Sequence, residues 1–221
     1  MRWTLPNILT ILRLLAAPAV ALMFLYFNRP FADWFALALF AAAAATDWID
    51  GRLARSWGLE TRFGAAMDPI ADKAMVLIAL AVILGYSNWS PWIVLPATLI
   101  IFREVFVSGL REYLGPAVGS LKVTSLAKWK TTVQMVAIAV LFGQGIFLHQ
   151  LIDRTIGMSP DIVQAILSGE MADEVGLRML EAGHIWSGRI GVMLLWLAAA
   201  LTLVTGWDYF RKAVPHLKEP T

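Results

Sequence analysis

The sequence contains no cysteine and few charged residues. Without cysteine, disulfides and thiolate metal sites are excluded, so a bound metal would need oxygen or nitrogen ligands. Of the 221 residues, 15% are charged and 59% hydrophobic, and the mean hydropathy is +0.68, which lies outside the range of soluble globular domains. The net charge is only +2 and the sequence has no long basic run, and both observations argue against a nucleic-acid partner. Composition therefore indicates an integral membrane protein surrounded by membrane lipids.

Long apolar runs set the predicted fold. A membrane helix needs roughly 20 mainly apolar residues, and six stretches reach that length: residues 7–27, 31–50, 66–85, 92–110, 126–148 and 189–207. Thr4, Pro6 and Asn7 predict the start of the first helix, and Asn28-Arg29-Pro30 predicts a turn after it. The sequence thus predicts an all-α, polytopic membrane protein with about six transmembrane helices, forming a single membrane-embedded domain over residues 1–221.

Two further features concern what lies outside the spans. Residues 149–188 are rich in acids and are expected to form an external acidic insertion with one or two short amphipathic helices. The distribution of Lys and Arg predicts that both termini are cytoplasmic, because basic residues are retained preferentially on that side. With this orientation, eleven basic residues lie inside and four outside, namely Arg29, Arg154, Arg178 and Arg189.

Four aspartates interrupt apolar sequence, where an unpaired carboxylate is costly. They form two pairs, Asp47 with Asp50 three residues apart and Asp68 with Asp72 four residues apart. On helices, each pair would project from one face, so two such helices could enclose a site with four carboxylates. Oxygen ligands of this kind suit hard cations, and we therefore expect all four aspartates to hold two divalent ions, Mg²⁺ or Mn²⁺.

The residues between the aspartates also fit phosphate chemistry. Small residues lie beside each pair, Gly51 and Ala54 next to the first and Gly64 next to the second, so that a flat nucleotide or a pyrophosphate could approach the backbone. Arg55 could supply a cation to a phosphate oxygen. Pro69 predicts that its helix begins close to the second pair, since proline is tolerated in the first turn and not deeper.

Eight positions keep a fixed spacing across 26 residues: Asp47, Asp50, Gly51, Ala54, Arg55, Gly64, Asp68 and Asp72. This pattern resembles the signature of the CDP-alcohol phosphotransferases, which are integral membrane enzymes of phospholipid synthesis. The stretches PNILTILRLLAAP, FREVFVSGLRE, VTSLAKWKTTVQM and GWDYFRKA resemble the bacterial branch of that family that forms phosphatidylglycerophosphate. The likeness covers residues 5–147 and about 189–213.

The resemblance implies a reaction and roles for the motif. The phosphatidyl group would pass from CDP-diacylglycerol to sn-glycerol 3-phosphate, with release of CMP, at the cytoplasmic face of a bacterial inner membrane. The four aspartates would hold the two cations, with Asp68 and Asp72 also catalytic and Asp72 as the general base. The small residues and Arg55 would contact the CDP moiety. We also expect a homodimer.

The acceptor carries a phosphate, so its pocket needs positive charge. The candidates are the basic residues of the predicted inner surface and the adjoining span: Arg103, Arg111, Lys122, Lys128 and Lys130. Arg103 lies in an apolar stretch, so it either pairs with Glu104 or a motif aspartate, or binds the acceptor phosphate. We assign the phosphate role to Arg103, Arg111 and Lys128. Lysines at the inner surface could instead bind anionic lipid headgroups, which is the interpretation we favour for Lys122 and Lys130.

Other functions are open at this point. The aspartate motif specifies the CDP donor and leaves the alcohol undetermined, so serine, inositol phosphate or phosphatidylglycerol are alternative acceptors. Acids within membrane spans also occur in cation transporters, although transport favours carboxylates at the bilayer midplane and an inverted repeat, which the sequence does not show. A purely structural set of ion pairs between the aspartates and Arg52, Arg55, Arg62 or Lys73 would not need the accompanying small residues.

Overall fold

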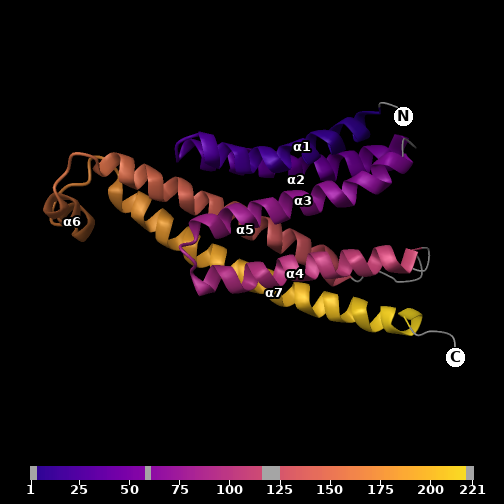
Figure 1. Cartoon of the computed structure of the whole chain (residues 1–221). Helices are drawn as coiled ribbons and strands as arrows, with labels where there is room; N and C mark the ends of the chain where they lie inside the picture. Colours follow the sequence, from indigo (N-terminus) through magenta and orange to yellow (C-terminus); the bar gives the residue numbers. More distant parts are fainter. Residues whose placement is uncertain (1–3, 58–60, 116–124, 218–221) are drawn as a thin grey trace. The chain divides into compact units, whose positions relative to one another are not determined.

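The computed structural model describes residues 4–57, 61–115 and 125–217, without the side chains at positions 47–57, 125, 127 and 128. Over these ranges the regular structure is entirely helical (Figure 1). The helices are α1 (Leu5–Tyr26), α2 (Phe31–Trp57), α3 (Arg62–Tyr86), α4 (Pro91–Leu114), α5 (Ser125–Thr155), α6 (Pro160–Ser168) and α7 (Leu177–Leu217). The predicted all-α fold is confirmed.

Four of the described helices are long and apolar enough to cross a membrane: α1, α4, α7 and the part Trp129–Thr155 of α5. A shorter apolar stretch, Phe31–Thr46, occupies the first part of α2. The two further predicted spans lie in α2 and α3, which are the helices that carry the aspartates. Together these helices make the chain a polytopic membrane protein.

The helices around the predicted insertion are longer than the sequence indicated. Helix α5 continues to Thr155 and α7 begins at Leu177, so both ends of the segment 149–188 are helical. Between them lies the short helix α6, as predicted. Its first turn is capped by Ser159, whose hydroxyl accepts a hydrogen bond from the Ile162 amide, and it ends at Gly169 in the left-handed conformation.

Helix α7 is capped by Asp173. The carboxylate of Asp173 accepts hydrogen bonds from the amides of Leu177 (2.8 Å) and Arg178 (3.0 Å). Desolvation opposes the charged form, but the amides of Arg178, Leu177 and Gly176 lower the pKa of Asp173 below its usual value.

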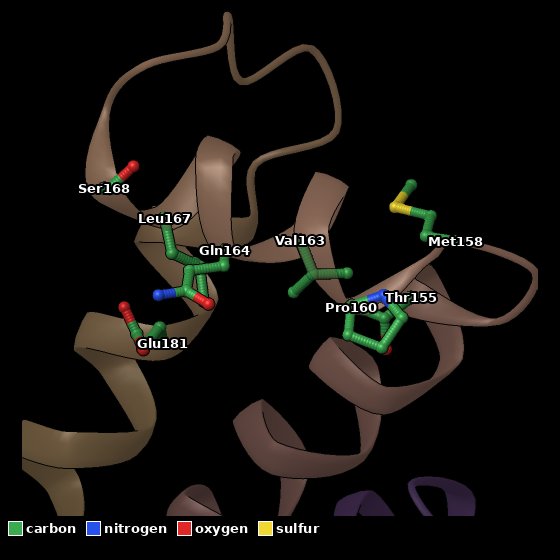
Figure 2. A pocket seen from close by; sticks show the side chains of 8 residues that line it. All are labelled: Thr155, Met158, Pro160, Val163, Gln164, Leu167, Ser168 and Glu181. Atoms are coloured by element: carbon green, nitrogen blue, oxygen red, sulfur yellow. The ribbon is translucent and has the colours of Figure 1, made fainter.

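A hollow of about 540 Å³ lies between the beginning of α7, the end of α5 and helix α6 (Figure 2). Glu181 and Gln164 are among the residues that line it, and none of the predicted site residues does.

The chain divides into two compact units. The first comprises Met1–Ile83 and Ile138–Gly191, and the second comprises Leu84–Ala137 and Val192–Thr221. Helices α1, α2 and α6 and all but the last residues of α3 belong to the first unit and α4 to the second, while α5 and α7 contribute to both. All four motif aspartates are therefore in the first unit, and the acceptor candidates from Arg103 to Lys130 are in the second.

In the first unit, glycines on α7 receive large side chains from α5. A Cβ added at Gly183, Gly188 or Gly191 would lie within 2.8 Å of side-chain atoms of Phe147, Gln144 or Leu141, respectively. Small residues are a common means of close helix packing in membranes, because lipid offers little hydrophobic driving force for helix association. The α5–α7 contact of this unit depends on these three positions.

Helix α3 begins earlier than predicted. The Thr61 hydroxyl accepts a hydrogen bond from the Gly64 amide (3.0 Å), which caps the helix before Arg62. Pro69 consequently lies inside the helix, and Asp68 belongs to its second turn. The prediction of a start near Asp68 was wrong because a threonine cap about two turns upstream starts the helix, and the packing of α3 tolerates the interior proline.

A buried ion pair follows the predicted turn between α1 and α2. The Nε atom of Arg29 donates to Asp33 Oδ2 (2.7 Å) and its Nη2 atom donates to Asp33 Oδ1, and the Asp33 side chain is fully buried. Helix α5 passes this pair at Gly145, where an added Cβ would overlap Asp33 Oδ1 and Arg29 and lie 2.9 Å from Asp33 Cγ. Only glycine lets α5 approach the pair.

We expect Gly145→Ala to lower the melting temperature of the detergent-purified protein, because the methyl group must displace a buried ion pair. Overpacking of this kind costs about 1–3 kcal/mol. Gly143→Ala is the matched control, since it lies on the same helix and an added Cβ there meets nothing within 4 Å. The control should keep or slightly raise the melting temperature, and equal losses in both variants would contradict the packing role of Gly145.

Candidate active site

One face of α1 carries polar residues at its start and apolar residues further along. Asn7, Thr10 and Arg13 follow each other every three residues and are 2%, 2% and 3% exposed. The same buried face continues with Ala17, Val20 and Phe24. The helical spacing therefore directs three hydrogen-bonding side chains towards the protein interior at one end of the span.

The partners of this polar face are the motif aspartates of α3. Arg13 Nη1 donates to Asp72 Oδ1 at 2.7 Å, and Arg13 Nη2 donates to Asp68 Oδ1 at 3.4 Å. The two aspartate side chains remain 44% and 46% exposed, whereas the arginine is buried. One guanidinium thus links the two carboxylates of the pair and leaves them accessible.

Thr10 and Asn7 extend the same contact. The Thr10 hydroxyl lies within hydrogen-bond distance of the Pro6 carbonyl and of Asp68 Oδ1, and the charged carboxylate is the stronger acceptor of its single proton. Asn7 Oδ1 accepts a hydrogen bond from the Thr61 hydroxyl (2.7 Å), the residue that caps α3. Through these contacts α1 fixes the first three turns of α3, where the aspartates lie.

Gly64 has a structural use besides the predicted one. A Cβ at this position would lie 3.1 Å from Asn7 Oδ1 and 3.3 Å from Thr61 Oγ1, and 3.8 Å from Asp68 Oδ2. The missing side chain therefore gives space to the polar contact between α1 and α3. Its assignment to the CDP moiety stays a prediction.

The other half of the predicted metal site lies in the last part of α2. Asp47, Asp50, Gly51, Ala54 and Arg55 are in this helix, and their side chains are outside the described residues. Among the side chains that are described, no three carboxylates or imidazoles come together. Asp68 and Asp72 nevertheless present oxygen donors one helical turn apart and partly open to their surroundings, which fits a hard divalent cation.

In the second unit, Arg103 forms the ion pair that the sequence left open as an alternative. Its Nη1 atom donates to Glu104 Oε1 (3.0 Å), and its Nη2 atom lies 3.4 Å from Thr205 Oγ1. Lys130 donates to the same oxygen of Glu104. One buried carboxylate therefore lies between two cations.

The burial of Lys130 corrects its predicted use. Its side chain is only 7% exposed, so the interpretation as a ligand of lipid headgroups was wrong. The acid partner it needs is Glu104, which lies inside the predicted span 92–110. Arg111 is exposed, and its guanidinium lies 5.7 Å from the centre of the Tyr209 ring. Lys122 and the side chain of Lys128 are outside the described residues.

Arg103 also depends on a glycine of α7. A Cβ at Gly206 would lie 2.8 Å from Arg103 Cγ and 3.3 Å from Arg103 Nε. The stem of the arginine thus packs directly on the α7 backbone. Arg103 is 12% exposed at its side chain, less than a surface residue but more than Glu104.

Arg13, Thr10 and Asn7 were missed as site residues in the sequence. The signal was present, because Arg13 is a single charge within the apolar run of residues 7–27, and such a charge needs a partner. The same argument was applied to Arg103. Which carboxylate Arg13 meets is decided by the packing of α1 on α3 and could not be read from the spacing.

Comparison with known proteins identifies the family of this chain. The sequence profile described as CDP-alcohol phosphatidyltransferase matches residues 3–205. A protein of Cereibacter sphaeroides named CDP-diacylglycerol–glycerol-3-phosphate 3-phosphatidyltransferase is 59% identical over 221 residues, which is 99% of both chains. Proteins of the same name are 35% identical in Rickettsia bellii, over 94% of this chain and 93% of the relative, and 42% identical in Escherichia coli K12, over 64% and 78%.

The matched region contains both the aspartates of α3 and the α1 residues that hold them. The predicted resemblance is confirmed, and the cation-transporter alternative has no further support. The chain is a membrane-embedded transferase that belongs to the CDP-alcohol phosphatidyltransferase family.

Proposed function

We propose that this protein transfers the phosphatidyl group from CDP-diacylglycerol to sn-glycerol 3-phosphate, forming phosphatidylglycerophosphate and releasing CMP. The observation that carries the proposal is the 59% identity, over essentially the whole chain, to a relative named for these two substrates. The accessible carboxylate pair on α3, held from α1, supplies the chemical groups that such a transfer needs. Serine, inositol phosphate and phosphatidylglycerol are disfavoured as acceptors, because the names of the relatives reported above all specify glycerol 3-phosphate.

The motif residues take the following roles in this proposal. Asp68 and Asp72, together with Asp47 and Asp50 of α2, would hold two divalent cations, Mg²⁺ or Mn²⁺. When bound, these ions would neutralise the diphosphate and the charge that develops on the CMP leaving group. Arg55 and the small residues Gly51, Ala54 and Gly64 would contact the CDP moiety.

The bond changes of the transfer are simple. The hydroxyl oxygen of glycerol 3-phosphate attacks the β-phosphorus of CDP-diacylglycerol, and the bond from that phosphorus to the CMP oxygen breaks. A carboxylate in reach of the hydroxyl takes its proton, and Asp72 is the residue we assign to this step. Arg13 donates to Oδ1 of Asp72 and to Oδ1 of Asp68 at the distances given above, and so holds both carboxylates from α1.

The acceptor phosphate is assigned to the basic residues of the second unit, Arg103, Arg111 and Lys128. The cluster of Arg103 and Lys130 on Glu104 supports this assignment, because it brings two cations together in this unit. The predicted cytoplasmic orientation of the site and the homodimer also belong to this proposal.

The reaction is tested with the full chain purified in detergent. CMP should be released from CDP-diacylglycerol only when glycerol 3-phosphate and Mg²⁺ or Mn²⁺ are both present, and chelation should stop the release. Serine, inositol phosphate and phosphatidylglycerol serve as the comparison acceptors. Faster release with one of these would refute the assigned acceptor, and release without an acceptor or without the cations would refute the transfer.

Asp72→Asn should keep binding of CDP-diacylglycerol while its turnover falls, because the amide cannot accept the acceptor proton. Loss of a general base lowers the rate by about 10²–10⁴-fold. Single-turnover CMP release measures the effect, and Asp161→Asn, an exposed acid of α6, is the control for the same chemical change. Turnover close to that of the wild type in Asp72→Asn would remove Asp72 as the base.

Arg103→Ala should raise the KM for glycerol 3-phosphate far more than the KM for CDP-diacylglycerol, because a phosphate ligand is lost on the acceptor side only. Arg189→Ala is the control, since this arginine is exposed and lies over the Trp186 ring in the first unit. Steady-state kinetics with each substrate varied in turn give both constants. Equal increases for the two substrates would mean that Arg103 serves only to pack against Gly206 and pair with Glu104.

A further inference from the structure

Arg13 is a deeply buried cation that contacts both α3 aspartates. It is 3% exposed within the apolar helix α1, where an unpaired guanidinium is costly. Its contacts with Asp72 (2.7 Å) and Asp68 (3.4 Å) come from its two different Nη atoms. The side chain therefore spans the two carboxylates and does not simply neutralise one of them.

The shape of the guanidinium is important in this contact. Its two Nη atoms are fixed in one plane, so the Oδ1 atoms they contact are fixed relative to each other. The Thr10 hydroxyl adds a second donor to Asp68 Oδ1 from the same face of α1. A lysine carries the same charge on a flexible stem with a single nitrogen, and it cannot reproduce a planar two-point contact.

We infer that Arg13 is a positioning residue of the active site. Its planar fork, aided by Thr10, sets the orientation of Asp68 and Asp72, and so determines which oxygens the two carboxylates offer to a divalent cation and to the acceptor hydroxyl. This inference rests on the proposed function of the aspartates as cation ligands and general base. Groups that orient metal ligands in this way affect metal affinity or activity without touching the substrate.

The decisive variant is Arg13→Lys, because it keeps the charge and removes the fork. We expect kcat to fall by about 10–100-fold, in the range found for groups that orient metal ligands. Binding of Mn²⁺ to the detergent-purified full chain without substrates, followed by electron paramagnetic resonance, should weaken in the same variant. A change in Mn²⁺ binding at constant charge is a readout that a merely structural arginine would not move.

Two matched pairs of variants separate positioning from folding. Thr10→Val removes the hydroxyl donor and leaves every charge in place, so it should weaken Mn²⁺ binding and lower kcat in the same direction, whereas Thr10→Ser keeps the hydroxyl and should match the wild type. Arg189→Lys makes the same exchange as Arg13→Lys at an exposed position and should have no effect. If Arg13→Lys does not fold, the Thr10 pair carries the test.

Several outcomes would overturn the inference. One is an Arg13→Lys variant with the kcat and Mn²⁺ binding of the wild type, which would show that charge alone suffices. Another is an Arg13→Lys variant with a lower melting temperature but unchanged Mn²⁺ binding and unchanged activity per folded molecule, which would show that Arg13 has only a structural role. Failure of the proposed function is recognised separately, since the wild type would then bind Mn²⁺ without releasing CMP to glycerol 3-phosphate.

Discussion

A buried guanidinium in an apolar helix must be paired, and the carboxylates that pair with Arg13 are those of the family motif. This constraint joins α1 to α3 and makes one contact serve both the packing of the first unit and the geometry of the site. Next to it, Thr10 donates to Asp68, and Asn7 accepts a hydrogen bond from Thr61, which links the α1 face to the start of α3. The α3 aspartates are consequently held from the buried side and stay accessible on the other.

The two units show opposite charge arrangements among their described side chains. In the first, a single arginine lies between two aspartates, which favours the binding of cations. In the second, a single glutamate lies between Arg103 and Lys130, which favours the binding of an anion. In the proposed reaction, the diphosphate donor would be bound through metal ions, and the acceptor carries a free phosphate.

Five helical glycines of this protein share one role. At Gly145, Gly183, Gly188, Gly191 and Gly206, the space left by the missing side chain is filled by a side chain from another helix. At Gly145 and Gly206 the neighbour belongs to an ion pair, so the glycine gives access to a charged group and not only to an apolar one. Close backbone approach of this kind replaces part of the hydrophobic driving force that is missing within a membrane.

The sequence by itself determined the class of the protein, its helices and its family, since apolar run length and the fixed spacing of eight positions depend only on local order along the chain. It also located Asp68 and Asp72 on one helix face and identified Arg103 as a charge that needs a partner. The tertiary structure decided the partners, because they come from segments far apart in the sequence: Arg13 is 55 residues from Asp68, and Lys130 is 26 residues from Glu104. It also moved the start of α3 to the Thr61 cap, because capping competes with the preference of Pro69 for a first turn.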